Sequence, residues 1–203
     1  ASSIIRTIWT KTLRAIAICQ RHFSSSHEMR KQSEANESLT MVRRALKDEV
    51  EGIMALLHQV NMVHHVLRPD LFRPHTTKYN EQELLSLIGD DSKPIFVYDD
   101  GEMVLGHAFC QITDVKDHRL LMDTKTLYID DICVDEVARG KHVGKALYEY
   151  VRDYARSIGC YNITLNVWEG NDPALFFYRN MGMKVQKTTM EIVLCNYSED
   201  ARD

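Results

Sequence analysis

The stretch from Tyr128 to Leu147 reads YIDDICVDEVARGKHVGKAL and joins three local patterns. Its first residues belong to a β-prone run from Thr126 to Val134, which predicts a strand. A basic turn with two glycines follows, from Arg139 to Lys145. Apolar residues then recur at helical spacing from Val143 to Ile158, and Gly159 stands where a helix would end. Strand, turn and helix in this order, with another strand after them, predict a right-handed parallel crossover.

Shorter patterns on both sides of this stretch predict the rest of an α/β fold with a mixed central sheet. We expect further strands over Leu39 to Ala45, Pro94 to Tyr98, Met103 to Ile112, Asn162 to Val167 and Lys184 to Leu194. We expect further helices beginning near Asp48 and ending before Pro69, over Asn80 to Ile88, and over Asp172 to Met181. These elements predict one domain over residues 39–195, preceded by an extension over residues 1–38 and followed by a tail over residues 196–203.

Composition excludes several classes of protein. The chain has 203 residues, of which 44% are hydrophobic and 27% charged, as in soluble globular proteins. Its net charge is −4, so it has no basic excess for binding nucleic acid. The five cysteines show no CxxC pair and predict reduced thiols. No apolar run approaches the roughly 18 residues of a membrane span, and the histidine spacing matches no metal-binding motif. We therefore expect no membrane, nucleic-acid or metal partner.

The first 27 residues differ from the rest, because they carry four basic residues and no acidic one. Such a segment resembles a mitochondrial transit peptide, which would place the protein in the mitochondrial matrix. The alternative is a dispensable upstream extension, since Met41 could itself be a start. In that case we expect a cytoplasmic protein.

The basic turn predicts an anion site. It would join the end of a strand to the start of a long helix, where unpaired N–H groups and the positive end of the helix dipole meet. Gly140 and Gly144 would let the backbone approach a phosphate, and Arg139, Lys141 and Lys145 would add positive charge. The spacing fits neither a Walker loop nor a GxGxxG dinucleotide turn. A nucleotide triphosphatase or a nicotinamide enzyme is therefore not expected.

Two further motifs follow this stretch in the chain. The stretch quoted above is followed by Asn171-Asp-Pro-Ala174 and then by Phe177-Tyr-Arg-Asn-Met-Gly-Met183. Together the three motifs resemble the GCN5-related N-acetyltransferase (GNAT) family, and the likeness covers Thr40 to Leu194. The resemblance implies a GNAT fold in which the strand ending at Val134 splays from its parallel neighbour, with helices flanking the sheet. It also implies direct transfer of an acetyl group from acetyl-CoA to a primary amine of a small molecule or peptide.

The resemblance assigns roles residue by residue. It places cofactor contacts at Ile132, Cys133, Val134, Arg139, Gly140, Lys141, His142, Val143, Gly144, Lys145, Asn171 and Tyr178. Within them, Arg139, His142 and Gly144 match the R/Q-x-x-G-x-G/A loop that binds the CoA pyrophosphate. His142 stands where the family has its first glycine. Either this position has a conformation open to a side chain, or the loop binds phosphate less tightly than usual.

The resemblance makes Tyr178 the general acid near the thioester sulfur. An alkyl amine is protonated at pH 7, and freeing its lone pair costs about 4.6 kcal/mol, so a base must help. Related polyamine-type enzymes carry a carboxylate at the position of Asp130, which we therefore expect to be the base or the amine anchor. Strand alternation sends Asp130 and Asp131 to opposite faces, so only one would face the acceptor. The alternative is that either aspartate caps a loop or pairs with a neighbouring base, or that Asp130 acts through a water.

A second class of function is a CoA-binding sensor or pseudoenzyme with the same fold. The histidine at position 142 supports it, whereas Asp130, Asn171 and Tyr178 argue for turnover. A homodimer is a further expectation.

Overall fold

The computed structural model describes residues 41–194 of the chain, so the basic segment 1–27 and the tail 196–203 lie outside the described residues. The elements, in chain order, are β1 (Val42–Arg44), the short 3-10 helix η1 (Lys47–Glu49), α2 (Val50–Leu67), α3 (Glu81–Leu87), β2 (Ile95–Asp99), β3 (Val104–Val115), β4 (Thr124–Val134), the 3-10 helix η2 (Glu136–Ala138), α4 (Val143–Ser157), β5 (Asn162–Leu165) and α5 (Asp172–Asn180). No helix within residues 41–194 is both long and apolar enough to cross a membrane.

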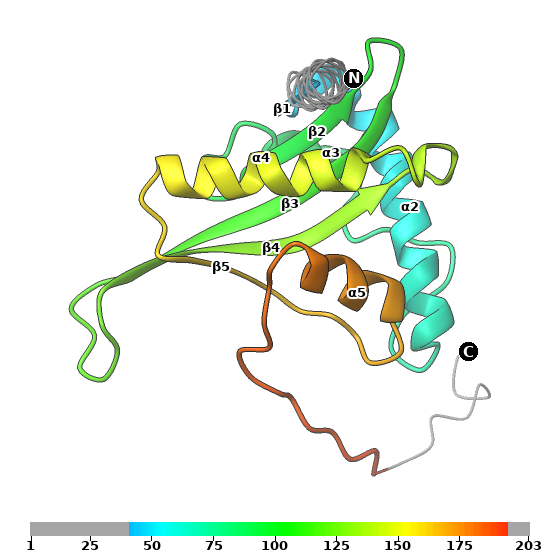
Figure 1. Cartoon of the computed structure of the whole chain (residues 1–203). Coiled ribbons are helices and arrows are strands. Elements are labelled where there is room, and N and C mark those ends of the chain that lie inside the picture. Colours follow the sequence, from blue (N-terminus) through cyan, green and yellow to red (C-terminus); the bar gives the residue numbers. More distant parts are fainter. Residues whose placement is uncertain (1–40, 195–203) are drawn as a thin grey trace, which may run out of the picture. The chain divides into compact units, whose positions relative to one another are not determined.

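The strands form one five-stranded sheet in the order β1-β2-β3-β4-β5. The first four strands pair antiparallel, and β4 pairs with β5 in parallel. Figure 1 shows α4 across one face of this sheet and α2 on the opposite face. The mixed sheet and the parallel crossover through α4 are therefore confirmed.

The main apolar core lies between the sheet and the α2–α3 side. Its fully buried members include Ile53 and Leu56 of α2, Leu84 of α3 and Val97 of β2. On the other face α4 buries the apolar positions that define its helical period, such as Leu147 and Val151. These two layers cover β3 and β4 from both sides.

Gly106 of β3 allows α4 to approach the sheet. A Cβ atom at this position would lie 2.8 Å from the carbonyl oxygen of Cys133 and 3.0 Å from a methyl group of Leu147. The first distance is shorter than a Cβ atom tolerates and the second is tight, so a side chain at this position would force β4 or the start of α4 to shift. The first turn of α4 is thereby held close to β3 and β4.

Most predicted boundaries agree with the structure within a few residues. Asn80 caps α3 by accepting a hydrogen bond from the Glu83 amide at 2.9 Å. Gly159 ends α4 with a φ of +76°, a left-handed value that suits glycine.

The expected strand over Lys184 to Leu194 is wrong. These residues have no strand partner among the described residues, and Figure 1 shows them running away from α5 and the sheet. The apolar side chains of the segment are exposed: Val185, Met190, Ile192, Val193 and Leu194. A β-prone segment becomes a strand only where the edge of a sheet accepts its backbone hydrogen bonds. Residues 184–194 lie along no edge of the five-stranded sheet.

Candidate active site

The two parallel strands separate halfway along β4. Pairing with β5 covers only the first part of β4 and ends where Ile129 faces Leu165. Residues 130–134 of β4 continue alongside β3 alone, from the Asp131–Phe109 pair to the Val134–Gly106 pair. Their edge on the β5 side is not paired with β5. The splay that the resemblance implied is present in the structure.

The unpaired edge leads directly into the basic turn. Asp135 caps η2 by accepting from the Val137 amide at 2.9 Å, and Gln59 of α2 donates to the same carboxylate at 2.9 Å. The first backbone hydrogen bond of α4 runs from the Ala146 amide to the His142 carbonyl, at 3.0 Å. No side chain caps this helix. The amides before Ala146 are therefore left for an anion at the positive end of the helix dipole.

His142 adopts the conformation of the glycine that it replaces. Its φ of +64° and ψ of 7° lie in the left-handed region, which costs a residue with a Cβ about 1 kcal/mol. This conformation favours glycine, so the histidine occupies it at a cost in free energy. The loop keeps the backbone shape of a glycine turn and places an imidazole at its tip.

Gly144 lies between the splayed strand and α5. A Cβ atom there would come within 3.3 Å of Val134 and 3.8 Å of Phe177. The basic side chains beside it are half-exposed: Arg139 lies 3.6 Å from Glu136, and Lys145 lies 4.0 Å from Glu149. Such weak, exposed pairs leave both cations available to a phosphate.

Asp130 and Asp131 lie on the same face of the sheet. Phe109 of β3 faces Asp131, and the next residue, Cys110, faces Ile129, so Asp130 is an extra residue in a β-bulge. The prediction that alternation sends the two carboxylates to opposite faces is therefore wrong. The bulge shifts the alternation by one residue and turns both acids toward the α2–α3 side.

Asp130 forms an ion pair with Lys78, in the loop before α3. Burial alone would lower the pKa of Lys78, but the hydrogen bond and charge of Asp130 outweigh it and raise that pKa. The ammonium also lies 5.5 Å from the ring of Tyr79, which stacks on Phe109. No local pattern in the sequence pointed to Lys78, because its partner is distant in the chain.

Tyr178 lies on α5 and faces the same region. Burial raises its pKa, and the charge of Asp131 and the nearby phenol of Tyr148 raise it further. The Tyr178 ring packs 5.1 Å from Phe177 and 6.3 Å from Tyr148. The phenol therefore stays protonated through the neutral range and can donate a hydrogen bond.

Two other residues of the predicted site make hydrogen bonds within the fold. Asn171 caps α5, because its side-chain oxygen accepts from the Ala174 amide at 3.3 Å. The Cys133 thiol donates to the Leu56 carbonyl at 3.4 Å, and burial with the charge of Asp131 raises its pKa to about 12. Such a thiol is no nucleophile, and only the backbone of Cys133 faces the free edge. No group of side chains within residues 41–194 could hold a metal ion.

The features described so far are a splayed parallel strand pair, a basic turn of glycine-type conformation and a protonated phenol on an α/β fold. The acetyltransferase (GNAT) family model matches residues 60–183, and the chain belongs to this family. Glucosamine 6-phosphate N-acetyltransferase of Arabidopsis thaliana is 35% identical over 66 residues, which are 32% of this chain and 42% of that enzyme. Streptothricin acetyltransferase of Streptomyces lavendulae is 41% identical over 56 residues, which are 28% of this chain and 30% of that enzyme.

Solved structures match over a longer part of the chain. A mutant of the BH1408 protein from Bacillus halodurans superposes with a TM-score of 0.72 at 29% identity, over 76% of this chain and 99% of that chain. Glucosamine-6-phosphate N-acetyltransferase from Arabidopsis thaliana has a TM-score of 0.56 at 22% identity, over 76% of this chain and 97% of that chain, and supports the fold alone. The curated relatives are matched over less than half of their own length.

Proposed function

We propose that the protein is an N-acetyltransferase that moves an acetyl group from acetyl-CoA directly to a primary amine. One observation carries this proposal: β4 leaves β5 at Ile129 and runs as a free edge into unpaired helix amides at Val143. A free edge offers N–H and C=O groups to the amides of a pantetheine arm at Ile132 and Val134, as a partner strand would. The helix start offers charge and N–H groups to a pyrophosphate.

The chain supplies groups for each part of the transfer. The basic turn from Arg139 to Lys145 binds the phosphates of the cofactor. The side-chain oxygen of Asn171 caps α5, so its side-chain nitrogen is left to donate a hydrogen bond to the pantetheine arm. Tyr178 donates a hydrogen bond to the departing sulfur. Because its pKa lies above that of a thiol, the phenol hands over its proton only as it receives another, from the newly acylated nitrogen.

The acceptor is proposed to be a small molecule or peptide with a primary ammonium group. Asp130 already holds one such group, the ammonium of Lys78. A substrate ammonium presents the same charge and the same three N–H donors to this carboxylate. We therefore propose that Asp130 anchors the amine. The relatives named for acetylating glucosamine 6-phosphate and streptothricin favour a small-molecule acceptor.

Two measurements on the full chain test the proposed function. In thermal unfolding, acetyl-CoA is expected to raise the melting temperature, whereas ATP and NAD at equal concentration leave it within error. Thiol release from acetyl-CoA is then followed with spermidine, glucosamine 6-phosphate, streptothricin and a peptide with a free N-terminus. At least one amine is expected to release thiol at one equivalent per acetylated product. Binding of acetyl-CoA without release by any amine would contradict turnover and favour the sensor.

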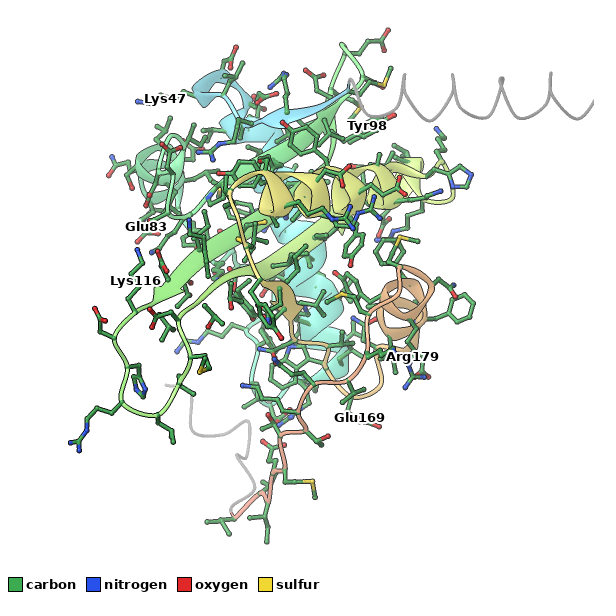
Figure 2. All side chains as sticks on the ribbon, turned by 60° about the vertical axis from the view of Figure 1, so that its left-hand side comes forward. Lys47, Glu83, Tyr98, Lys116, Glu169 and Arg179 are labelled. Carbon is green, nitrogen blue, oxygen red and sulfur yellow. The ribbon has the colours of Figure 1, made fainter. Side chains whose placement is uncertain are left out.

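We also propose a homodimer in which two copies exchange the segment 184–194. The chain carries both an edge strand, β5, and an extended segment with five exposed apolar side chains. Even-numbered residues from Met190 to Leu194 are apolar, so the segment can present one apolar side as a strand. Figure 2 shows Arg179 and Glu169 at the end of the molecule from which this segment leaves. In two copies related by a twofold axis, segment 184–194 of each copy would pair with β5 of the other.

Replacing Ile192 with aspartate is expected to convert this dimer to a monomer, because a charge cannot be buried in the exchanged strand without a partner. Size-exclusion chromatography with light scattering measures the mass at 5 to 100 µM of protein, concentrations on the order of ordinary weak-dimer constants. Thr189→Asp is the matched control, since it adds the same charge on the other side of the segment. A wild-type monomer throughout, or an unchanged dimer in Ile192→Asp, would contradict the exchange.

The cytoplasmic location stays a prediction, and so does the matrix location tied to residues 1–27. Domain boundaries at residues 38 and 195 also stay predictions.

A further inference from the structure

The side chain of Lys78 brings a primary ammonium to Asp130 from a distant part of the chain. Both residues line a pocket, together with Tyr79, Lys93 and Phe109. The Lys78 side chain is 51% exposed and that of Asp130 is 25% exposed, so solvent reaches both charged groups. The ion pair therefore lies where small molecules from solution can also reach the carboxylate.

The loop that carries Lys78 is tied to the sheet through the next residue. The Thr77 hydroxyl donates a hydrogen bond to the Tyr79 carbonyl at 2.7 Å, and the Tyr79 ring stacks on Phe109 with 5.8 Å between the ring centroids. These contacts hold the loop against β3. The lysine therefore meets Asp130 at an effective concentration far above that of a dilute external amine.

Asp130 lies where the free edge of β4 begins. Pairing with β5 ends at Ile129, and the pantetheine arm is proposed to pair with Ile132 and Val134. A strand advances roughly 3.3 Å per residue, so an arm that enters from the start of α4 reaches Asp130 about 13 Å beyond Val134. Beyond Asp130 the edge is taken by β5. The thioester end of acetyl-CoA is therefore expected beside Asp130, and so beside the amine that this carboxylate holds.

We propose that Lys78 is an internal acceptor, which the protein acetylates on Nζ within its own chain when no external amine occupies Asp130. This inference rests on the proposed acetyl transfer and assigns a modification site to it. The Lys78 ammonium first loses one proton to solvent. The free amine then forms the N–C bond as the C–S bond breaks, and a second proton passes from the nitrogen to the sulfur by way of Tyr178. One acetyl-lysine, one CoA thiol and one proton are formed.

Acetylation of Lys78 is expected to become faster as the pH rises. Burial alone would lower the pKa of Lys78, but the hydrogen bond and charge of Asp130 outweigh it and raise that pKa. The free amine is therefore the minor form at neutral pH, and its fraction grows about tenfold per pH unit below the pKa. Other charged or titratable groups around the amine are Asp131 from β4, Tyr79 from the same loop, and Lys93 and Cys110 in the same pocket.

The test incubates the full chain with acetyl-CoA at pH 8 without an external amine, and mass spectrometry of intact protein and peptides locates the acetyl groups. Wild type is expected to be acetylated at Lys78. Lys78→Arg keeps a positive charge for Asp130, but a guanidinium does not become a free amine, so position 78 should stay unmodified. Lys93→Arg is the matched control, because Lys93 lines the same pocket while Asp130 pairs with Lys78. It should be acetylated at Lys78 like wild type.

Two comparisons separate catalysed transfer from chemical acetylation by acetyl-CoA in solution. In Gly144→Trp, where the indole occupies the path of the arm, acetylation of Lys78 should be at least about tenfold slower. The first-order rate constant in wild type should not change with protein concentration, because the donor site and the acceptor lie in one chain. Equal rates in Gly144→Trp, a rate at Lys78 no faster than at Lys93, or a rate that rises with protein concentration would overturn the internal acceptor.

External amines distinguish this inference from the proposed function. An amine that the protein acetylates should slow acetylation of Lys78, because both compete for Asp130. Turnover of an external amine by a protein whose Lys78 stays unmodified in its absence would overturn the inference and leave the proposed function intact. Acetylated Lys78 without turnover of any external amine would instead contradict only the small-molecule or peptide acceptor. Bound acetyl-CoA with neither reaction would overturn both.

Discussion

Replacing Gly144 with tryptophan is expected to abolish binding of acetyl-CoA, measured by titration calorimetry, with affinity reduced at least 100-fold. Even a Cβ at this position comes within 3.3 Å of Val134 and 3.8 Å of Phe177. An indole must therefore occupy the gap between the splayed strand and α5, where the arm of the cofactor is proposed to lie. The same side chain also covers the helix amides that would hold the pyrophosphate.

Two companion variants separate lost binding from lost folding. Asp153→Trp adds the same side chain to α4 at an exposed position and should bind acetyl-CoA like wild type. Gly144→Ala adds only a Cβ, which Val134 can accommodate by a small shift, and should bind acetyl-CoA close to wild type. Circular dichroism establishes that each variant is folded. Wild-type affinity in folded Gly144→Trp would place the cofactor elsewhere.

Replacing Tyr178 with phenylalanine is expected to lower kcat by about 100-fold while the affinity for acetyl-CoA stays close to wild type. The ring and its packing against Phe177 remain, and only the group that donates to the sulfur is lost. Because burial and the charge of Asp131 raise the pKa of Tyr178, wild-type kcat should show no loss from phenol ionisation up to about pH 10.

Tyr148→Phe is the control for this change, since Tyr148 is a buried neighbour of Tyr178 on α4. Tyr148→Phe should leave kcat within about threefold of the wild-type value. Steady-state thiol release at saturating acetyl-CoA gives kcat for each variant. Unchanged turnover in Tyr178→Phe would mean that solvent protonates the thiolate.

Local patterns in the sequence were sufficient for most of the fold. The strand, glycine turn and helix from Thr126 to Ile158 each have their own periodicity, and their order limits the topology to a parallel crossover. The basic turn at the start of α4 could be predicted for the same reason, since the start of the helix and its flanking bases lie within a few residues. Helix caps such as Asn80 are equally local.

The sequence-based predictions that failed, and the residues that they missed, depend on contacts between segments distant in the chain. A bulge depends on how β4 pairs with β3, so the sequence of β4 alone could not reveal that Asp130 and Asp131 share a face. Lys78 and His107 reach these acids from other elements, and no spacing rule joins them. The strand expected over residues 184–194 failed similarly, because strand propensity says nothing about which edge is free.

The extra residue at Asp130 also affects which solutes reach the surface around Asp130 and Asp131. Two carboxylates on one face against the single ammonium of Lys78 leave one negative charge uncompensated. A partly enclosed charge attracts cations from solution and repels anions, over distances that salt limits to about 8 to 10 Å. One inserted residue in a strand thus changes the local charge that dissolved cations and anions meet. If these acids line the acceptor site as proposed, we expect acceptors with several positive charges to arrive faster than those that carry a phosphate, by a margin that shrinks as ionic strength rises.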